Sequence, residues 1–144
     1  MKVFLAFAYR DTDKELAGYC DQLLASQFAQ TVTGKTLGGN ALTPEVQQRI
    51  ESCAAVVGLL TRRDAKVDGT FTTHQWLTEE LAFARTKGKR AIAMVETGVD
   101  LGGMYQAHEF ILLDRANPLP AFLKLAETVG EWKRALGRTI KVQI

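Results

Sequence analysis

Val3-Phe4-Leu5-Ala6-Phe7-Ala8 is an unbroken apolar run close to the start of the chain. A strand that helices cover on both faces has this composition, whereas a half-exposed strand alternates apolar and polar residues. A second run of the same kind extends from Ala54 to Leu60. The two runs therefore predict buried strands in a parallel sheet, with the first strand central.

Helix-forming patterns follow these strands along the chain. Thr12 or Asp13 can cap a first helix, and Thr43 followed by Pro44 can start a second one. The other expected elements are helices over residues 74–87 and 119–136 and strands over residues 30–32, 90–95 and 109–113. This alternation predicts a flavodoxin-like α/β fold: a doubly wound, five-stranded parallel sheet of order 2-1-3-4-5 with helices on both faces.

The composition fits one globular domain. The chain has 144 residues, 47% of them hydrophobic, and 18 basic against 16 acidic residues give a formal net charge of +2. This balanced charge predicts neither nucleic acid nor an anionic membrane as a partner. The sequence contains no leader pattern and no apolar run long enough to span a bilayer, so a cytoplasmic location is expected.

The end of the chain has a different pattern. Residues Thr139 to Ile144 alternate polar and apolar side chains, which is typical of a strand with one exposed face. We therefore expect one domain over residues 1–138. Residues 139–144 would then form an edge strand or the stub of a longer parent chain.

Trp76 and Glu80 are the best candidates for chemistry. They lie four residues apart in the helix expected over residues 74–87, so both side chains lie on one helical face. That helix follows a buried strand and begins near the carboxyl edge of the sheet, where open α/β sheets bind ligands. A carboxylate beside an indole can hold a flat, positively charged or ribose-bearing ligand. Glu79 points about 100° away around the helix and should face solvent.

Four short motifs occur in the order in which Toll/interleukin-1 receptor (TIR) domains carry them. Residues 3–11 resemble the first strand and loop of that family, and residues 34–53 resemble its second-strand loop and following helix. Residues 54–61 are similar to its third strand. Residues 76–81, Trp-Leu-Thr-Glu-Glu-Leu, match the Trp-x-x-x-Glu-Leu pattern of its enzymes. The resemblance covers about residues 2 to 136 and is closest to bacterial, NAD-cleaving TIR-like domains.

The chain departs from the family pattern at three places. Ala8 stands where Ser or His is usual, Leu77 stands where Cys is common, and the loop over residues 62–73 is longer than typical. These departures affect the expected ligand contacts more than the expected fold.

The resemblance implies that NAD is the substrate and that its nicotinamide–ribose bond is cleaved, by hydrolysis or cyclisation, in bacterial antiviral defence. It also implies homo-oligomers formed through TIR–TIR contacts and no separate cofactor. Glu80 would be the catalytic residue, stabilising an oxocarbenium ion as carboxylates do in glycoside hydrolysis. Substrate contacts are implied for Phe7, Ala8, Tyr9, Arg10, Gly34, Lys35, Gly38, Gly39 and Trp76.

The sequence offers residues that could bind phosphate but no pattern typical of a metal site. Arg10 follows the first strand and offers a bidentate guanidinium to a pyrophosphate, and the glycines of the second-strand loop allow close backbone approach. His74 and His108 lack partners at metal-ligand spacing, so no metal site is expected.

Two other functions fit the same residues. The chain can be a non-catalytic TIR scaffold that binds other TIR domains, with Glu80 incidental. It also resembles nucleoside 2-deoxyribosyltransferases in its apolar first strand and in the unit from Glu80 to Lys89. The pair of Trp76 and Glu80 favours an enzyme over a scaffold, and the glycine-rich loop with Tyr9-Arg10 favours a TIR enzyme over the transferase.

Overall fold

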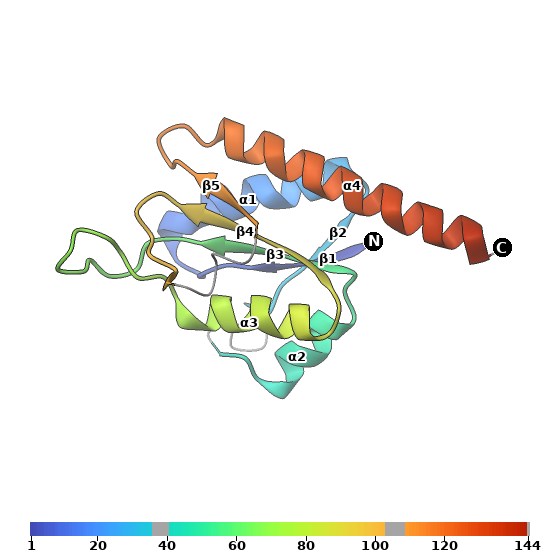
Figure 1. The fold of residues 1–144 in the computed structure, drawn as a ribbon, viewed down its shortest axis with the longest axis horizontal. Helices are drawn as coiled ribbons and strands as arrows, with labels where there is room; N and C mark the ends of the chain where they lie inside the picture. Colours follow the sequence, from blue (N-terminus) through green and yellow to red (C-terminus); the bar gives the residue numbers. More distant parts are fainter. Residues whose placement is uncertain (36–40, 103–108, 144) are drawn as a thin grey trace.

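The protein is built around one five-stranded sheet with helices on both of its faces (Figure 1). The computed structural model describes residues 1–35, 41–102 and 109–143. The strands are β1 (Lys2–Ala6), β2 (Gln30–Val32), β3 (Ala55–Leu60), β4 (Arg90–Glu96) and β5 (Phe110–Leu113). The helices are α1 (Asp11–Ser26), α2 (Pro44–Glu51), α3 (Gln75–Thr86) and α4 (Leu119–Gln143).

The sheet is entirely parallel and has the order β2-β1-β3-β4-β5, which confirms the predicted flavodoxin-like topology. Strand β1 pairs with β3 from Val3 opposite Ala55 to Ala6 opposite Gly58. Because the strands are parallel, their carboxyl ends meet at one edge. The strand order reverses between β1 and β3, so this edge holds the switch point at which such sheets bind ligands.

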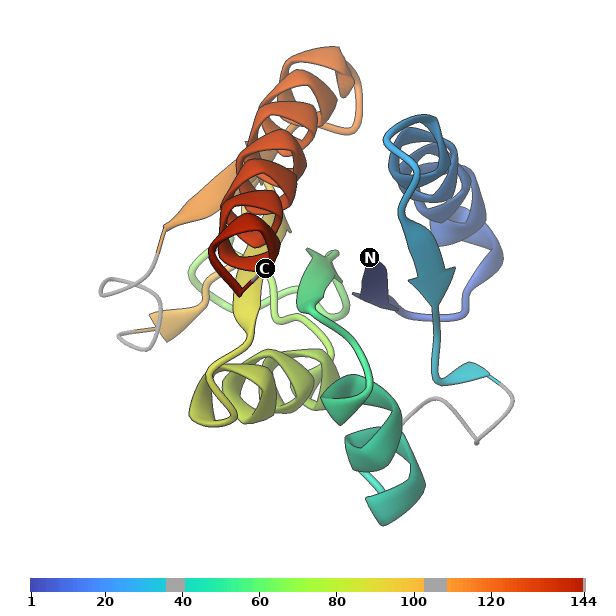
Figure 2. The same ribbon diagram turned by 90° about the vertical axis from the view of Figure 1, so that its right-hand side faces the viewer.

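Two apolar cores lie on opposite faces of the sheet. Helices α1 and α4 cover one face, and α2 and α3 cover the other (Figure 2). Neighbouring residues of β1 enter different cores, Leu5 on the α1 side and Phe4 on the α2 side, and all six residues of β3 are buried. Each large apolar side chain that is fully buried contributes about 1.5–3 kcal/mol, which explains why these strands are apolar throughout.

The predicted start of α2 is confirmed and the predicted start of α1 is wrong. The Thr43 side chain accepts a hydrogen bond from the Val46 N–H at 3.3 Å, with Pro44 as the first residue of α2. Helix α1 begins at Asp11, and no side chain caps it. Asp13 does not serve as the cap because its carboxylate is fully buried and bonded to other elements.

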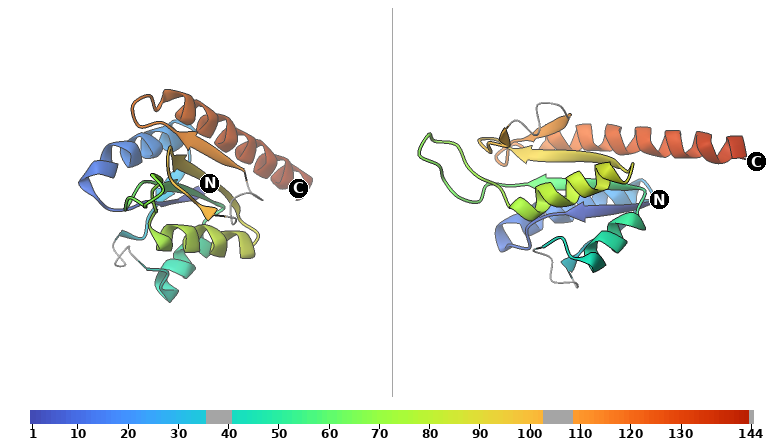
Figure 3. Two further views of the ribbon diagram at one scale, coloured as in Figure 1. Left: turned by 60° about the vertical axis from the view of Figure 1, so that its left-hand side comes forward. Right: turned by 60° about the horizontal axis from the view of Figure 1, so that its bottom comes forward.

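The C-terminal strand expected over residues 139–144 is also wrong. Helix α4 continues to Gln143 and extends past the end of the sheet (Figure 3). An existing helix adds one hydrogen bond for each further residue without a new nucleation step, and this gain outweighs the strand preference of β-branched residues. Among the described residues, no helix combines the length and apolar character needed to cross a membrane.

The long connection over residues 62–73 projects from the carboxyl edge of the sheet (Figures 1 and 3). Phe71 forms bridges with Ala65 in its own loop and with Val99 after β4. The Arg62 guanidinium lies 4.5 Å from the centre of the Phe71 ring. These contacts hold the projecting loop beside the ends of β3 and β4.

Candidate functional site

Glu80 is a buried acid on α3. Only 4% of the residue is exposed, and no described residue forms a hydrogen bond or ion pair with its carboxyl group. Burial, followed by repulsion from Glu79, raises the pKa of Glu80 to about 8. Glu79 itself is exposed, as predicted. A buried acid with a strongly shifted pKa, on a helix that begins at the carboxyl edge of the sheet, fits a catalytic role.

Close packing of α3 on β3 fixes where Glu80 lies. A Cβ atom on Gly58 would approach Leu81 Cδ1 to 2.7 Å, so α3 packs closely on β3 through the Leu81 side chain. Leu77, Leu81 and Ala84 are fully buried on the same helix. The backbone around Glu80 is therefore held between two packed turns.

The start of α3 carries three buried polar atoms without partners among the described residues. They are Nδ1 and Nε2 of His74 and Nε1 of Trp76. The two rings lie 4.6 Å apart with an interplanar angle of 51°. Leaving a buried polar group unpaired costs about 1–3 kcal/mol. A ligand group with both a donor and an acceptor would satisfy this pair of side chains.

His74 is the residue of this group that the sequence did not identify as a site residue. It is 6% exposed, and burial, followed by the positive charge of Arg10, lowers its pKa. The ring is therefore neutral at pH 7, with one donor and one acceptor nitrogen. Its place just before the Trp76 helix was visible in the sequence, but burial of both nitrogens was not.

Tyr9 brings several predicted residues together. Its ring lies 4.5 Å from that of Phe7, and its hydroxyl would be 3.6 Å from a Cβ on Gly34. Burial, followed by the charge of Glu80, raises the pKa of Tyr9 to about 12. Tyr9 therefore lies close to the catalytic candidate, to the end of β1 and to the residues after β2.

Arg10 is held by the protein rather than free for a ligand. Its Nη2 atom lies 3.1 Å from an Asp13 carboxylate oxygen and donates to the Thr61 hydroxyl at 3.0 Å. The preceding Ala8 is buried, and its carbonyl accepts a hydrogen bond from the Arg10 backbone N–H at 2.8 Å. The predicted phosphate contact of Arg10 would therefore have to share its guanidinium with Asp13.

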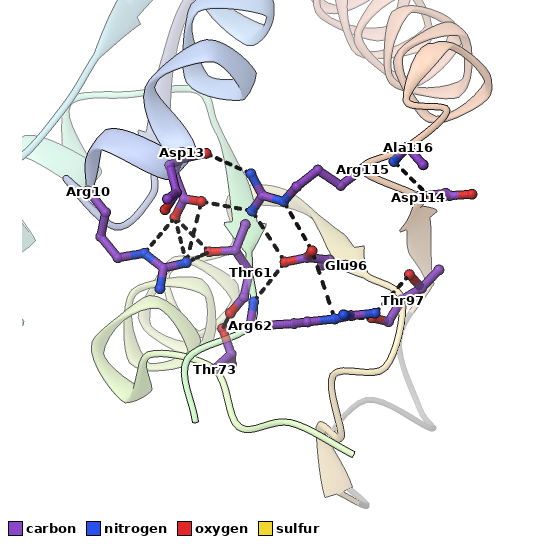
Figure 4. A network of polar contacts seen from close by, with 11 residues as sticks. Arg10, Asp13, Thr61, Arg62, Thr73, Glu96, Thr97, Asp114, Arg115 and Ala116 are labelled. Carbon is purple, nitrogen blue, oxygen red and sulfur yellow. Dashed lines mark hydrogen bonds and ion pairs between the residues drawn. The ribbon is translucent and has the colours of Figure 1, made fainter. Parts of the chain in front are cut away.

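A network of buried acids and arginines extends from Arg10 across the edge of the sheet (Figure 4). Arg115 donates to Asp13 at 2.9 Å and to Glu96 at 3.1 Å, and the Arg62 backbone N–H donates to Glu96 at 2.9 Å. Burial alone would raise the pKa of Glu96, but the bonds from Arg115 and Arg62 outweigh it, so the pKa is below its usual value. The sequence did not predict this network.

Two cavities open near this edge. One, of about 710 Å³, is lined by Arg10, Arg62, Glu96 and Arg115. The other, of about 380 Å³, lies between β1, β2 and α1, and Phe7, Tyr9 and Lys35 line it. Glu80 is not among the lining residues of either cavity.

The remaining predicted substrate contacts come from the loop after β2. Gly34 is buried beneath the Tyr9 hydroxyl, and Lys35 is exposed next to it. Gly38 and Gly39 lie outside the described residues. Within the described part of the chain, no cluster of three or more His, Cys, Asp or Glu side chains is arranged to hold a metal ion.

Comparison with known proteins gives structural similarity without sequence similarity. No protein-family model matches the chain, and no curated protein sequence matches it. Solved structures share the fold, and they include the following three. The CMP N-glycosidase BcmB of Clostridium botulinum has a TM-score of 0.55 and 16% identity over 87% of this chain and 98% of its own.

The other two structures are equally distant in sequence. A 2-deoxyribosyltransferase of Bacillus psychrosaccharolyticus has a TM-score of 0.56 and 13% identity over 79% of this chain and 86% of its own. A prokaryotic SEFIR domain has a TM-score of 0.57 and 11% identity over 88% of this chain and 96% of its own. At these identities the similarity establishes the fold alone.

Proposed function

We propose that this protein cleaves the N-glycosidic bond between a ribose and a nitrogen base, with Glu80 acting at the ribose and NAD as the substrate. The observation that carries the proposal is the buried Glu80 carboxyl group, which forms no hydrogen bond or ion pair with any described residue. It lies close to Tyr9 and on the same helix as Trp76. Two structures of the same fold are named for chemistry at sugar–base bonds, an N-glycosidase and a deoxyribosyltransferase. Their names support the reaction class, and the TIR resemblance supports NAD.

The charge of NAD suits a buried carboxyl group. Its pyridinium ring is cationic, and a nearby positive charge favours the ionised form of Glu80. The C1′–N bond then breaks with its electron pair going to the ring nitrogen, so nicotinamide leaves as a neutral molecule. Ionised Glu80 stabilises the oxocarbenium ion that remains.

The second half of the reaction needs only a nucleophile. Water adds its oxygen to C1′ and loses a proton, which the Glu80 carboxylate can accept, and the product is ADP-ribose. If a nucleophilic atom elsewhere in the same substrate attacks C1′ instead, the product is cyclic. Either product would suit the TIR-type role in NAD depletion or antiviral signalling.

A pyrimidine nucleotide is the second candidate substrate. A neutral base such as cytosine leaves poorly unless it is protonated, and a carboxyl group with a pKa of about 8 carries a proton at pH 7. Glu80 would then act first as a general acid. This alternative predicts a pH dependence opposite to that expected for NAD.

Self-association is part of the proposal. In TIR-type enzymes neighbouring copies complete the site. If a monomer adopts the binding-competent conformation only part of the time, its apparent affinity for the substrate falls in proportion to that fraction. Specific activity should therefore rise with protein concentration. A constant specific activity from nanomolar to high micromolar protein, measured on a proven monomer, would contradict this part.

The deciding experiment is incubation of the purified protein at high concentration with NAD and, separately, with CMP. Chromatography should detect nicotinamide together with ADP-ribose or a cyclic product from NAD, and cytosine from CMP would identify the second candidate. If neither base is released by an assembled protein, a scaffold function remains.

A further inference from the structure

The cavity of about 380 Å³ on the α1 side of the sheet has no role in the chemistry described above. We call it the α1 cavity. The lining residues that matter for its chemistry are Phe7, Tyr9, Gly18, Asp21, Thr31 and Lys35. Phe7 and Tyr9 meet edge to face at 67° and form an aromatic wall. Gly18 of α1 also lines the cavity, and a Cβ atom there would meet nothing within 4 Å.

Two polar groups of the α1 cavity have no hydrogen-bond or ion-pair partner among the described residues. The Thr31 hydroxyl is buried and has no hydrogen-bond partner among the described residues. Lys35 is exposed, and its ammonium group forms no ion pair within the described part of the chain. Lys14, which also lines the cavity, is paired with Asp11 at 2.8 Å.

These groups match the parts of a nucleoside monophosphate. A flat base can stack on the aromatic wall, as bases do on Tyr and Phe side chains elsewhere. Lys35 can bind a phosphate, and Asp21 can accept hydrogen bonds from ribose hydroxyls. The buried Thr31 hydroxyl can donate to or accept from the edge of the base.

Tyr9 connects this cavity to the catalytic candidate. Tyr9 lines the α1 cavity, and its hydroxyl lies beside Gly34, where a Cβ atom would also meet Phe4 and Val46 of the core that α3 covers. We infer that the α1 cavity binds the adenylate half of a dinucleotide while the other half reacts at Glu80. This inference rests on the proposed function and deepens it, because it predicts selection of dinucleotides over mononucleotides.

The test fills the cavity from α1. Gly18→Trp places a large ring in the cavity, and Gly18→Ala is the matched control with the same change of backbone freedom. Binding of AMP is measured by calorimetry, and KM is measured for NAD and for nicotinamide mononucleotide, which lacks the adenylate half. We expect Gly18→Trp to weaken AMP binding and raise the KM for NAD by at least about tenfold, with the KM for the mononucleotide unchanged.

A second variant covers the case in which Gly18→Trp fails to fold. Thr31→Val keeps the shape of the side chain and removes only the unpartnered hydroxyl, so AMP affinity should fall by about threefold to tenfold. Unchanged AMP affinity in this variant and in folded Gly18→Trp would overturn the inference, as would absence of AMP binding to the wild type.

The outcomes separate this inference from the proposed function. If AMP binds in the cavity and no base is released from NAD, the cavity inference stands and the proposed function fails. If NAD is cleaved with the same KM in wild type and Gly18→Trp, the proposed function stands and the cavity inference fails.

Discussion

Arg115 donates a hydrogen bond from Nη2 to Asp13 Oδ1 at 2.9 Å, although 102 residues separate them in the sequence. The bond joins the first turn of α1 to the connection between β5 and α4. Thr61 at the end of β3 donates to the other Asp13 oxygen at 2.7 Å. The buried Asp13 carboxylate therefore connects the end of β3, at the switch point of the sheet, to the residues that follow the edge strand β5.

Asp13→Asn should destabilise the fold by about 2 kcal/mol, because the charge-assisted bonds from Arg10 and Arg115 are lost while both arginines remain partly accessible to water. Chemical denaturation measures this change. Asp11→Asn is the matched control and should change stability little, since the ion pair that Asp11 forms with Lys14 lies on the surface. Equal stability of wild type and Asp13→Asn would show that the network is not a stabilising element.

Glu80→Gln should lower kcat for NAD cleavage by about a hundredfold to a thousandfold, because one preorganised charge at the reacting ribose is lost. Product release measured by chromatography, at equal folded protein, tests this. Glu79→Gln changes the neighbouring exposed acid and should leave kcat nearly unchanged. Full activity of Glu80→Gln would remove Glu80 from catalysis, and loss of activity in Glu79→Gln alone would identify the other acid.

The raised pKa of Glu80 also predicts a pH-dependent stability. The folded state holds the proton up to about pH 8, whereas the unfolded chain releases it near the usual glutamate pKa of 4.5. Between these values the folded state binds more protons, so stability falls as pH rises. Glu80→Gln lacks this titration. Its Tm relative to that of wild type should therefore rise from pH 5 to pH 9. At pH 9 its free energy of unfolding should exceed that of wild type by an amount on the order of 3 kcal/mol.

Ionisation of Glu80 should also determine how the rate of NAD cleavage depends on pH. If ionised Glu80 acts on cationic NAD, kcat/KM should increase with pH and level off above about pH 8, the pKa in the free enzyme. Steady-state rates from pH 5.5 to pH 9.5 give this profile. A decrease of kcat/KM above pH 8 would instead identify Glu80 as a general acid.

Two glycine-to-alanine variants should have opposite effects. Gly58→Ala places a methyl group 2.7 Å from Leu81 Cδ1, so the buried Leu81 side chain must move, at a cost of about 1–3 kcal/mol. Gly18→Ala lies in α1 with open space around its Cβ position and should stabilise the protein by about 1 kcal/mol. Thermal unfolding of the two proteins checks the signs.

Apolar patterning was sufficient to predict the sheet and its strand order. The runs at β1 and β3 and the Thr43–Pro44 start of α2 are local signals, and each had its expected outcome. The start of α1 was predicted wrongly because Asp13 looks like a cap in sequence. In the structure Asp13 is buried and bonded to the distant Arg115 and Thr61, which no spacing rule connects to it, as well as to Arg10.

The candidate site was predictable only in part because its other features depend on contacts between residues that are distant in the sequence. The spacing of Trp76 and Glu80 indicated a shared helical face, but the unpaired nitrogens of His74 depend on packing around them. The α1 cavity required β1, β2 and α1 to be placed together before Thr31 and Gly18 became relevant. The end of α4 was missed because a local strand pattern competes with a helix already formed.

The two outer strands also affect how the protein behaves at high concentration. Strand β2 has three residues and β5 has four. A sheet edge this short presents few unpaired N–H and C=O groups, which makes it a poor template for aggregation by strand addition. Copies that associate in concentrated assays should therefore do so through helices and loops. Their assembly should be reversible on dilution and should not generate the intermolecular β-sheet signal of amyloid-like material in infrared spectra.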